Sequence, residues 1–267
     1  MATNLFRNVF NALAGKPLDD DYYYLYLHDQ AEQRAKAAYS SEALSYLKAL
    51  KPYSGYPIPD FESREDEQSG IWIVTEKTLG QLEDFAREHR ISLQNLFTAA
   101  GAAALGKYNH ARQVGVRWTY NGRDEAWKER LMGMLVAGIP ADVDLDQCDT
   151  GEKLLQEVKR QAMQGIRYSP LSAAFREFTP GLSERLSIVY QHGEYSPDNL
   201  PEGAETGMYL EYFNGALTLF EFIIFEQGED RPLRIEAVYN CNRYRKESAE
   251  TFAKMFAREI DCGCQMS

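Results

Sequence analysis

The sequence predicts an α/β fold in which helices pack on a mixed, largely antiparallel sheet. Short runs of alternating apolar and polar residues, as at 139–145 and 233–239, are typical of half-buried strands, and amphipathic helical segments separate them. The Asn214-Gly215 dipeptide between two apolar runs is the strongest hairpin signal in the chain. At 267 residues, the sequence is long enough for one large domain or for a domain with an appendage.

The charge and hydrophobicity of the sequence indicate which kinds of partner the protein can bind. The formal net charge is −11, and no local basic cluster offsets it, so we expect no nucleic-acid partner. The sequence is 44% hydrophobic and 26% charged, as in ordinary soluble proteins, and no apolar run approaches the length of a membrane span. The first residues lack the layout of a secretory signal. We therefore predict a cytoplasmic protein without a membrane partner.

Three regions of the sequence differ in composition and in the spacing of their apolar residues. Residues 1–50 predict a helical arm, because Leu5, Val9 and Leu13 recur every fourth residue and Ser40 or Ser41 can cap a further helix. Residues 51–70 are rich in proline and acidic residues, which predicts a linker. Residues 71–267 form the predicted main lobe.

Within that lobe, helix and strand signals are distinct. Thr78 and Gln81 have capping-box spacing, and the small residues Ala99 to Ala104 indicate a helix that packs closely on its neighbours. Further helices are predicted near 150–162 and at 252–256. The predicted strands lie at 71–74, 114–118, 139–145, 186–190, 209–213, 216–225 and 233–239.

Motifs alone predict no catalytic residue, no metal site and no bound cofactor. The sequence contains no phosphate-binding glycine loop and no nucleophile elbow, and its four histidines have no catalytic spacing. Its four cysteines do not form two spaced pairs, so free thiols are expected rather than a zinc site. Glu221, between Phe220 and Phe222, is the carboxylate with the most apolar neighbours, but alternation favours an exposed position on a strand.

One segment resembles a known family. Residues 114–143 read VGVRWTYNGRDEAWKERLMGMLVAGIPADV. This is similar to the condensation-domain pattern of a strand, a Gly-Arg pair, a variable helix and a floor loop. Gly122-Arg123 supplies the pair, and residues 132–136 with Pro140 supply the loop. Residues 91–108 and the Tyr239-Asn240 pair resemble the family's flanking elements, and FRNVFNALAGKPL near the N-terminus resembles the helix that follows its His-His-x-x-x-Asp-Gly motif.

The resemblance implies one half of a chloramphenicol acetyltransferase-like fold, namely the C-terminal lobe of a nonribosomal peptide synthetase condensation domain. Such domains form amide bonds between carrier-tethered acyl groups in the biosynthesis of secondary metabolites. The implied partners are the N-terminal lobe and carrier proteins, whose phosphopantetheine arm tethers the substrate. The residues placed at the substrate tunnel by resemblance are Arg123, Gly133, Leu135, Val136, Ala137 and Pro140.

Departures from the pattern leave alternatives open. The floor-loop Asn-Thr is replaced by Ala137-Gly138, and the histidine motif has no counterpart, so we expect a fragment that is inactive alone. Arg123 and Gly133 fit a structural role as well, as the partner of a carboxylate and as a point of close backbone approach. The rival hypotheses are a non-catalytic binding or assembly protein and a divergent coenzyme A-dependent acyltransferase. A face left uncovered by the absent lobe, with Leu135 on it, would favour a homodimer.

Overall fold

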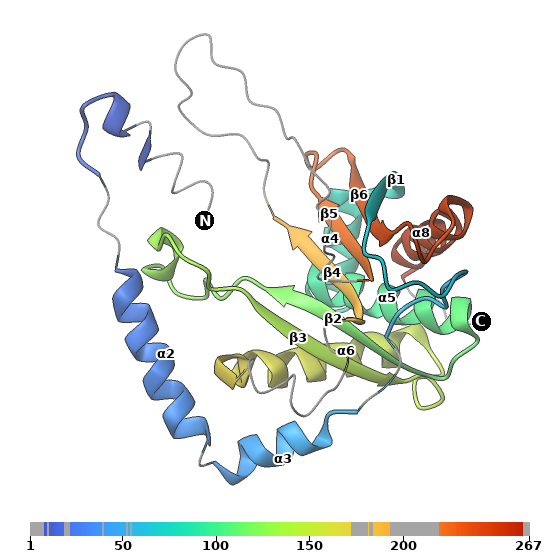
Figure 1. Ribbon diagram of the computed structural model, residues 1–267, viewed down its shortest axis with the longest axis horizontal. Helices are drawn as coiled ribbons and strands as arrows, with labels where there is room; N and C mark the ends of the chain where they lie inside the picture. Colours follow the sequence, from blue (N-terminus) through green and yellow to red (C-terminus); the bar gives the residue numbers. More distant parts are fainter. Residues whose placement is uncertain are drawn as a thin grey trace.

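The computed structural model describes residues 8–9, 11–18, 22–38, 40–51, 53, 55–171, 181, 184–192 and 219–263. The two N-terminal helices α2 and α3 extend as an arm along one side of a lobe built from a sheet and its helices (Figure 1). The helices are α2 (Tyr23–Ala38), α3 (Ser41–Ala49), α4 (Leu79–Glu88), α5 (Leu93–Asn109), α6 (Gly151–Arg167) and α8 (Lys246–Asp261). The strands are β1 (Gln68–Thr78), β2 (Gln113–Tyr120), β3 (Ala137–Asp144), β4 (Leu186–Gln191), β5 (Phe220–Phe225) and β6 (Pro232–Asn240).

The six strands form one mixed sheet in the order β1-β6-β5-β4-β2-β3. The β1–β6, β5–β6 and β2–β3 pairs are antiparallel, whereas β2–β4 and β4–β5 are parallel. Because β2, β4 and β5 run in the same direction, their carboxyl ends meet at one edge of the sheet. The mixed α/β class predicted from the sequence is therefore confirmed.

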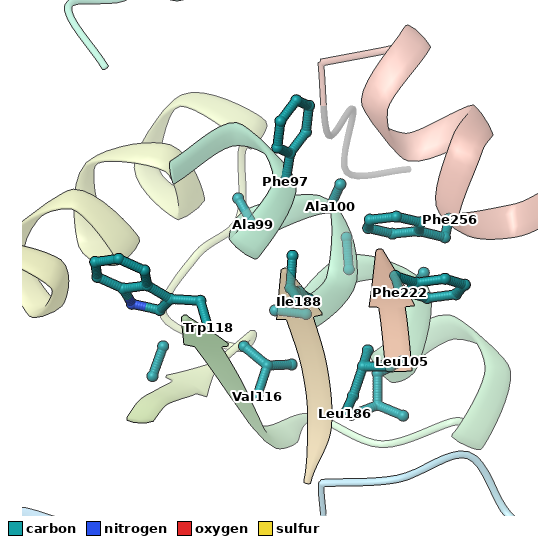
Figure 2. Packing of buried hydrophobic residues seen from close by; sticks show 14 of the residues in the cluster. Phe97, Ala99, Ala100, Leu105, Val116, Trp118, Leu186, Ile188, Phe222 and Phe256 are labelled. Atoms are coloured by element: carbon teal, nitrogen blue, oxygen red, sulfur yellow. The ribbon is translucent and has the colours of Figure 1, made fainter. Parts of the chain in front are cut away.

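Helix α5 lies at the centre of the covered face of the sheet, between α6 and α8. Figure 2 shows Ile188 of β4 pointing toward Ala100 of this helix, while Phe222 of β5 lies beside Phe256 of α8. A Cβ atom at Gly101 of α5 would overlap the Ile188 side chain, so the small-residue run permits the close packing expected from the sequence. The core is close-packed at this point, with the Phe222 and Phe256 rings stacked at 4.0 Å between centroids.

Helix starts agree with the capping signals in the sequence. Thr78 and Gln81 form a complete capping box at the start of α4. The side chains of Ser92 and Thr150 accept hydrogen bonds from the first turns of α5 and α6. The predicted hairpin turn at Asn214-Gly215 and the strand at 209–213 lie outside the described residues. Among the described helices, none combines the length and apolar character needed to cross a membrane.

The proline-rich segment before β1 is bound to the lobe along much of its length. Asn109, at the end of α5, accepts a hydrogen bond from the Ile58 amide and donates one to the Tyr56 carbonyl. Asp60 accepts hydrogen bonds from the Arg245 amide at 2.8 Å and from a serine hydroxyl of α8. These contacts hold the segment against α5 and α8, although its described residues before Gln68 form no helix or strand.

A buried ion pair at the edge of the sheet binds the start of this segment through hydrogen bonds. The Arg185 side chain is 1% exposed, and its Nη1 lies 2.5 Å from Oδ1 of Asp142 on β3. Its Nη2 donates to the Lys51 carbonyl at 2.5 Å, while the Lys51 amide donates to Asp142 at 2.8 Å. Gly55 and Gly115 flank the Arg185 side chain, and a Cβ atom at either position would overlap it. The pair therefore joins β3, β4 and the end of the arm.

We predict that Asp142→Asn lowers the free energy of unfolding by about 3 kcal/mol, because it leaves the buried Arg185 without its counter-ion. The matched control is Asp146→Asn, since Asp146 pairs with Arg112 at 3.6 Å on the surface, where both side chains are mostly exposed. This control is expected to cost less than about 1 kcal/mol. Urea denaturation of both variants measures the difference, and equal losses would contradict the role of the buried pair.

Candidate functional site

The connection between β2 and β3 is a long loop whose shape depends on one guanidinium group. Nη1 of Arg123 donates to the carbonyls of Lys128 and Leu131, at 2.5 and 3.1 Å, and Nη2 donates to the Gly133 carbonyl at 3.1 Å. A guanidinium carries five N–H donors in a rigid plane, so it can satisfy several loop carbonyls that lack strand partners. Arg123 therefore holds the loop from inside, through backbone carbonyls rather than through a carboxylate.

The middle of this loop packs against the start of α2. A Cβ atom at Gly133 would overlap the ring of Tyr23, whose hydroxyl donates to the Met134 carbonyl at 3.2 Å. Leu135 is 4% exposed and packs with Tyr26 and Leu131 in a small apolar cluster, separate from the main core. The loop residues and the tyrosines of the arm thus hold each other in place.

Between α2 and this loop lies a pocket of about 440 Å³, within the size range of small-molecule sites. Its walls combine apolar side chains of the loop with hydroxyl and amide groups from α2 and β2. Its described lining includes no histidine, and its ionisable side chains include Asp124, Glu125 and Lys128. It is lined by Tyr23, Tyr26, Leu27, Gln30, Gln33, Tyr120, Gly122, Asp124, Glu125, Lys128, Met134, Leu135, Val136, Ala137, Ile166, Arg167, Ser169 and Pro170.

A buried cation lies at one end of the pocket. The Lys128 side chain is 7% exposed, and its Nζ lies 2.7 Å from carboxylate oxygens of both Asp124 and Glu125. Burial lowers the pKa of Lys128, but hydrogen bonds to the two carboxylates outweigh burial and hold the pKa above its usual value. Burial and the hydrogen bond to Asp124 raise the pKa of Tyr120 to about 12, so its hydroxyl stays protonated. Lys128 and its two carboxylate partners together carry a net charge of −1.

The structure divides the six residues assigned to the tunnel by resemblance. Leu135, Val136 and Ala137 line the pocket, and Val136 is half exposed. Arg123 and Gly133 lie behind the lining and shape it. Pro140 is buried in the edge strand β3, opposite Arg117, where a residue without an N–H costs no ladder hydrogen bond.

Tyr23, Tyr26 and Lys128 were not predicted as site residues. The tyrosine run was visible in the sequence, but its position against a loop more than 100 residues away has no local signal. Leu135, expected on an uncovered face, is buried instead, so a charge there would disrupt the loop rather than probe an interface. The exposed apolar side chains near the loop are Tyr24, Leu25, Leu27, Trp127, Met134 and Val136.

Glu221 is half-buried, contrary to the exposed position favoured by alternation. Burial raises its pKa above the usual value, while the Ser187 hydroxyl and the charge of Arg117 act in the opposite direction. The fully buried Glu236 raises it further. His89 and His110 are the C-cap residues of α4 and α5, the helix-end positions expected from the sequence.

A larger groove of about 1160 Å³ lies between α3 and α6. Its lining mixes acidic and basic side chains, such as Glu42, Glu157, Lys153 and Arg160, many of them paired with one another. None of the residues assigned by resemblance lines it. We therefore place the candidate site in the smaller pocket beside the β2–β3 loop.

Comparison with known proteins adds an independent line of information. A family model described as "Condensation domain" matches residues 6–264. A linear gramicidin synthase of Brevibacillus parabrevis is 22% identical over 246 residues, and AMB antimetabolite synthetase AmbE of Pseudomonas aeruginosa is 23% identical over 236 residues. These matches cover 79% and 86% of this chain but 4% and 11% of the relatives, so the chain spans a small part of their length.

Solved structures share the fold. The SgcC5 protein of Streptomyces globisporus aligns with a TM-score of 0.74 at 16% identity, over 96% of this chain and 63% of that one. The first condensation domain of the calcium-dependent antibiotic synthetase aligns with a TM-score of 0.71 at 14% identity, over 99% of this chain and 60% of that domain. At these identities the likeness is one of fold.

We predict that Arg123→Met lowers the free energy of unfolding by about 2 kcal/mol, because three loop carbonyls lose a charged donor. Arg130→Met, an exposed change in the same loop, is the control and is expected to stay within about 0.5 kcal/mol of the parent. Chemical denaturation provides the comparison. If both variants behave like the parent, the guanidinium does not hold the loop.

Proposed function

We propose that this chain, which belongs to the condensation-domain family, provides the C-terminal lobe and the floor loop of such a domain, and with them one wall of its substrate tunnel. Members of the family in peptide synthetases form amide bonds. The observation that carries the proposal is the pocket between α2 and the β2–β3 loop, because residues that match the family's floor loop form part of its lining.

The pocket suits a flexible chain that alternates methylene and amide groups, as in a carrier's phosphopantetheine arm. Leu135, Val136 and Ala137 offer apolar surface, while Gln30 and Gln33 offer amide donors and acceptors. Lys128 is already paired with two carboxylates, so its positive charge is not available to an anionic ligand, and a neutral tether does not require it. This supports a carrier-tethered acyl group as the ligand class.

A second lobe would bring the histidine motif, which these 267 residues do not contain. The exposed apolar side chains of α2 and the loop, with Tyr24 at 65% and Met134 at 64%, support a partner surface beside the pocket. We place the histidine-bearing lobe there, whether it is part of the same polypeptide or a separate chain. A homodimer through this surface is the alternative occupant, and it fits the hypothesis of a non-catalytic assembly protein.

If the pocket binds the tether, acetyl-pantetheine should bind to the purified protein. Val136→Trp places a large ring in the pocket, so it should weaken this binding roughly tenfold or more. The control is Met163→Trp, since Met163 is 65% exposed on α6 and does not line the pocket. Saturation-transfer NMR with the purified protein measures both affinities. Equal affinities of the two variants, or no binding by the parent, would show that the pocket is not the binding site.

The one-wall role predicts that the chain alone forms no amide between a loaded donor carrier and a loaded acceptor carrier. A placed general base contributes about a hundredfold to ten-thousandfold, and no histidine lines the described pocket. Mass spectrometry of the two carriers after incubation, against a reaction without the chain, tests this. Amide product that disappears when any one of the four histidines is replaced would overturn the proposal.

A further inference from the structure

Outside the pocket, a histidine is held by a buried carboxylate at the carboxyl ends of the parallel strands. His192 directly follows β4, and Glu226 directly follows β5. Nδ1 of His192 lies 2.8 Å from Oε1 of Glu226. The hydroxyl of Tyr190, the second residue before His192, donates to the same oxygen. Strand pairing produces this group, because the β4–β5 register sets Gln191 beside Phe225 and so brings the following residues together.

The hydrogen bonds determine which nitrogen of the imidazole is free. Burial, the bond to Glu226 and the charges of Glu226 and Glu83 raise the pKa of Tyr190, so its hydroxyl remains a donor. An ionised carboxylate only accepts hydrogen bonds, so Nδ1 of neutral His192 must carry the proton in its bond to Glu226. The Nε2 lone pair is then the free basic position, on a side chain that is 81% exposed.

The carboxylate is rigidly placed, which separates this pair from an ordinary surface contact. Glu226 is 8% exposed, and Tyr190 packs edge-on against Phe97 of α5 at 5.0 Å between centroids. His89 makes a comparable contact with Glu152, but Glu152 is 52% exposed and His89 also ends α4 and lies against Phe85. The His89 pair is thus a natural control within the same chain.

The position of the group points to a ligand. In sheets with parallel strands, sites form at the carboxyl ends of the strands, where the loops diverge. The β2–β4 pair is also parallel, so the β2–β3 loop leaves the sheet at the same edge as His192. His192 therefore lies at the same edge of the sheet as the loop that lines the pocket.

We propose that His192 is a proton-accepting residue for a hydroxyl nucleophile, water being the simplest, and that Glu226 is its positioning residue. The step with an activated ester as probe is balanced. The water oxygen attacks the ester carbonyl carbon as its proton passes to Nε2 of His192, and the adduct expels p-nitrophenolate to leave acetic acid. The imidazolium then returns its proton to solvent. This inference does not depend on the role proposed for the pocket.

The test is hydrolysis of p-nitrophenyl acetate by the 267-residue protein and three variants. His192→Gln is expected to lower the hydrolysis rate roughly tenfold or more. This is near the low end of the contribution of a placed base, because the His192 ring is exposed. His89→Gln should keep a rate within about twofold of the parent. Glu226→Gln should fall between the two. If His192→Gln and His89→Gln lower the hydrolysis rate by similar factors, both act as ordinary surface imidazoles and the proposal is wrong.

A second readout isolates the role of Glu226. Long-range ¹H–¹⁵N NMR of histidine-labelled protein should show His192 as the Nδ1–H tautomer in the parent, and Glu226→Gln should move it toward the Nε2–H form. Circular dichroism checks that His192→Gln and Glu226→Gln are folded. An unchanged tautomer with an unchanged hydrolysis rate in Glu226→Gln would refute the positioning role.

Discussion

The buried pair between Arg185 and Asp142 is the constraint on which the arrangement of the molecule depends. A guanidinium out of water needs a counter-ion, and here the Asp142 carboxylate supplies the charge while one backbone carbonyl accepts a hydrogen bond. Because the carbonyl belongs to Lys51, the end of α3 must pass this point of the sheet. The two glycines beside Arg185 leave room for the passage.

The position of the arm then determines the pocket. Once α3 is fixed against the lobe, α2 leads back along its side and its first turn reaches the β2–β3 loop (Figure 1). The loop has no strand partner of its own, so Arg123 and the Tyr23 hydroxyl satisfy its carbonyls. The pocket is therefore a product of two long-range contacts, one at each end of the arm.

The direction of the strands places two chemically different regions at one edge of the sheet. The loop that lines the pocket follows β2, and His192 and Glu226 follow β4 and β5, which run parallel to β2. One region offers apolar surface and amide groups for binding a flexible ligand, and the other offers a basic nitrogen. The proposed binding site and the proposed proton acceptor thus lie at the same edge of the sheet.

The sequence by itself determined the local elements. Alternation located β2, β3 and β6, and the capping box at Thr78 and Gln81 located the start of α4, because these signals act between residues a few positions apart. The floor-loop likeness at Gly122-Arg123 directed attention to the loop that lines the pocket. Tertiary structure alone decided that Leu135 is buried, that Glu221 is half-buried and that Arg185 meets Asp142. Those outcomes depend on which strands pair and which face a helix covers. Such contacts join residues tens of positions apart, for which a local pattern has no signal.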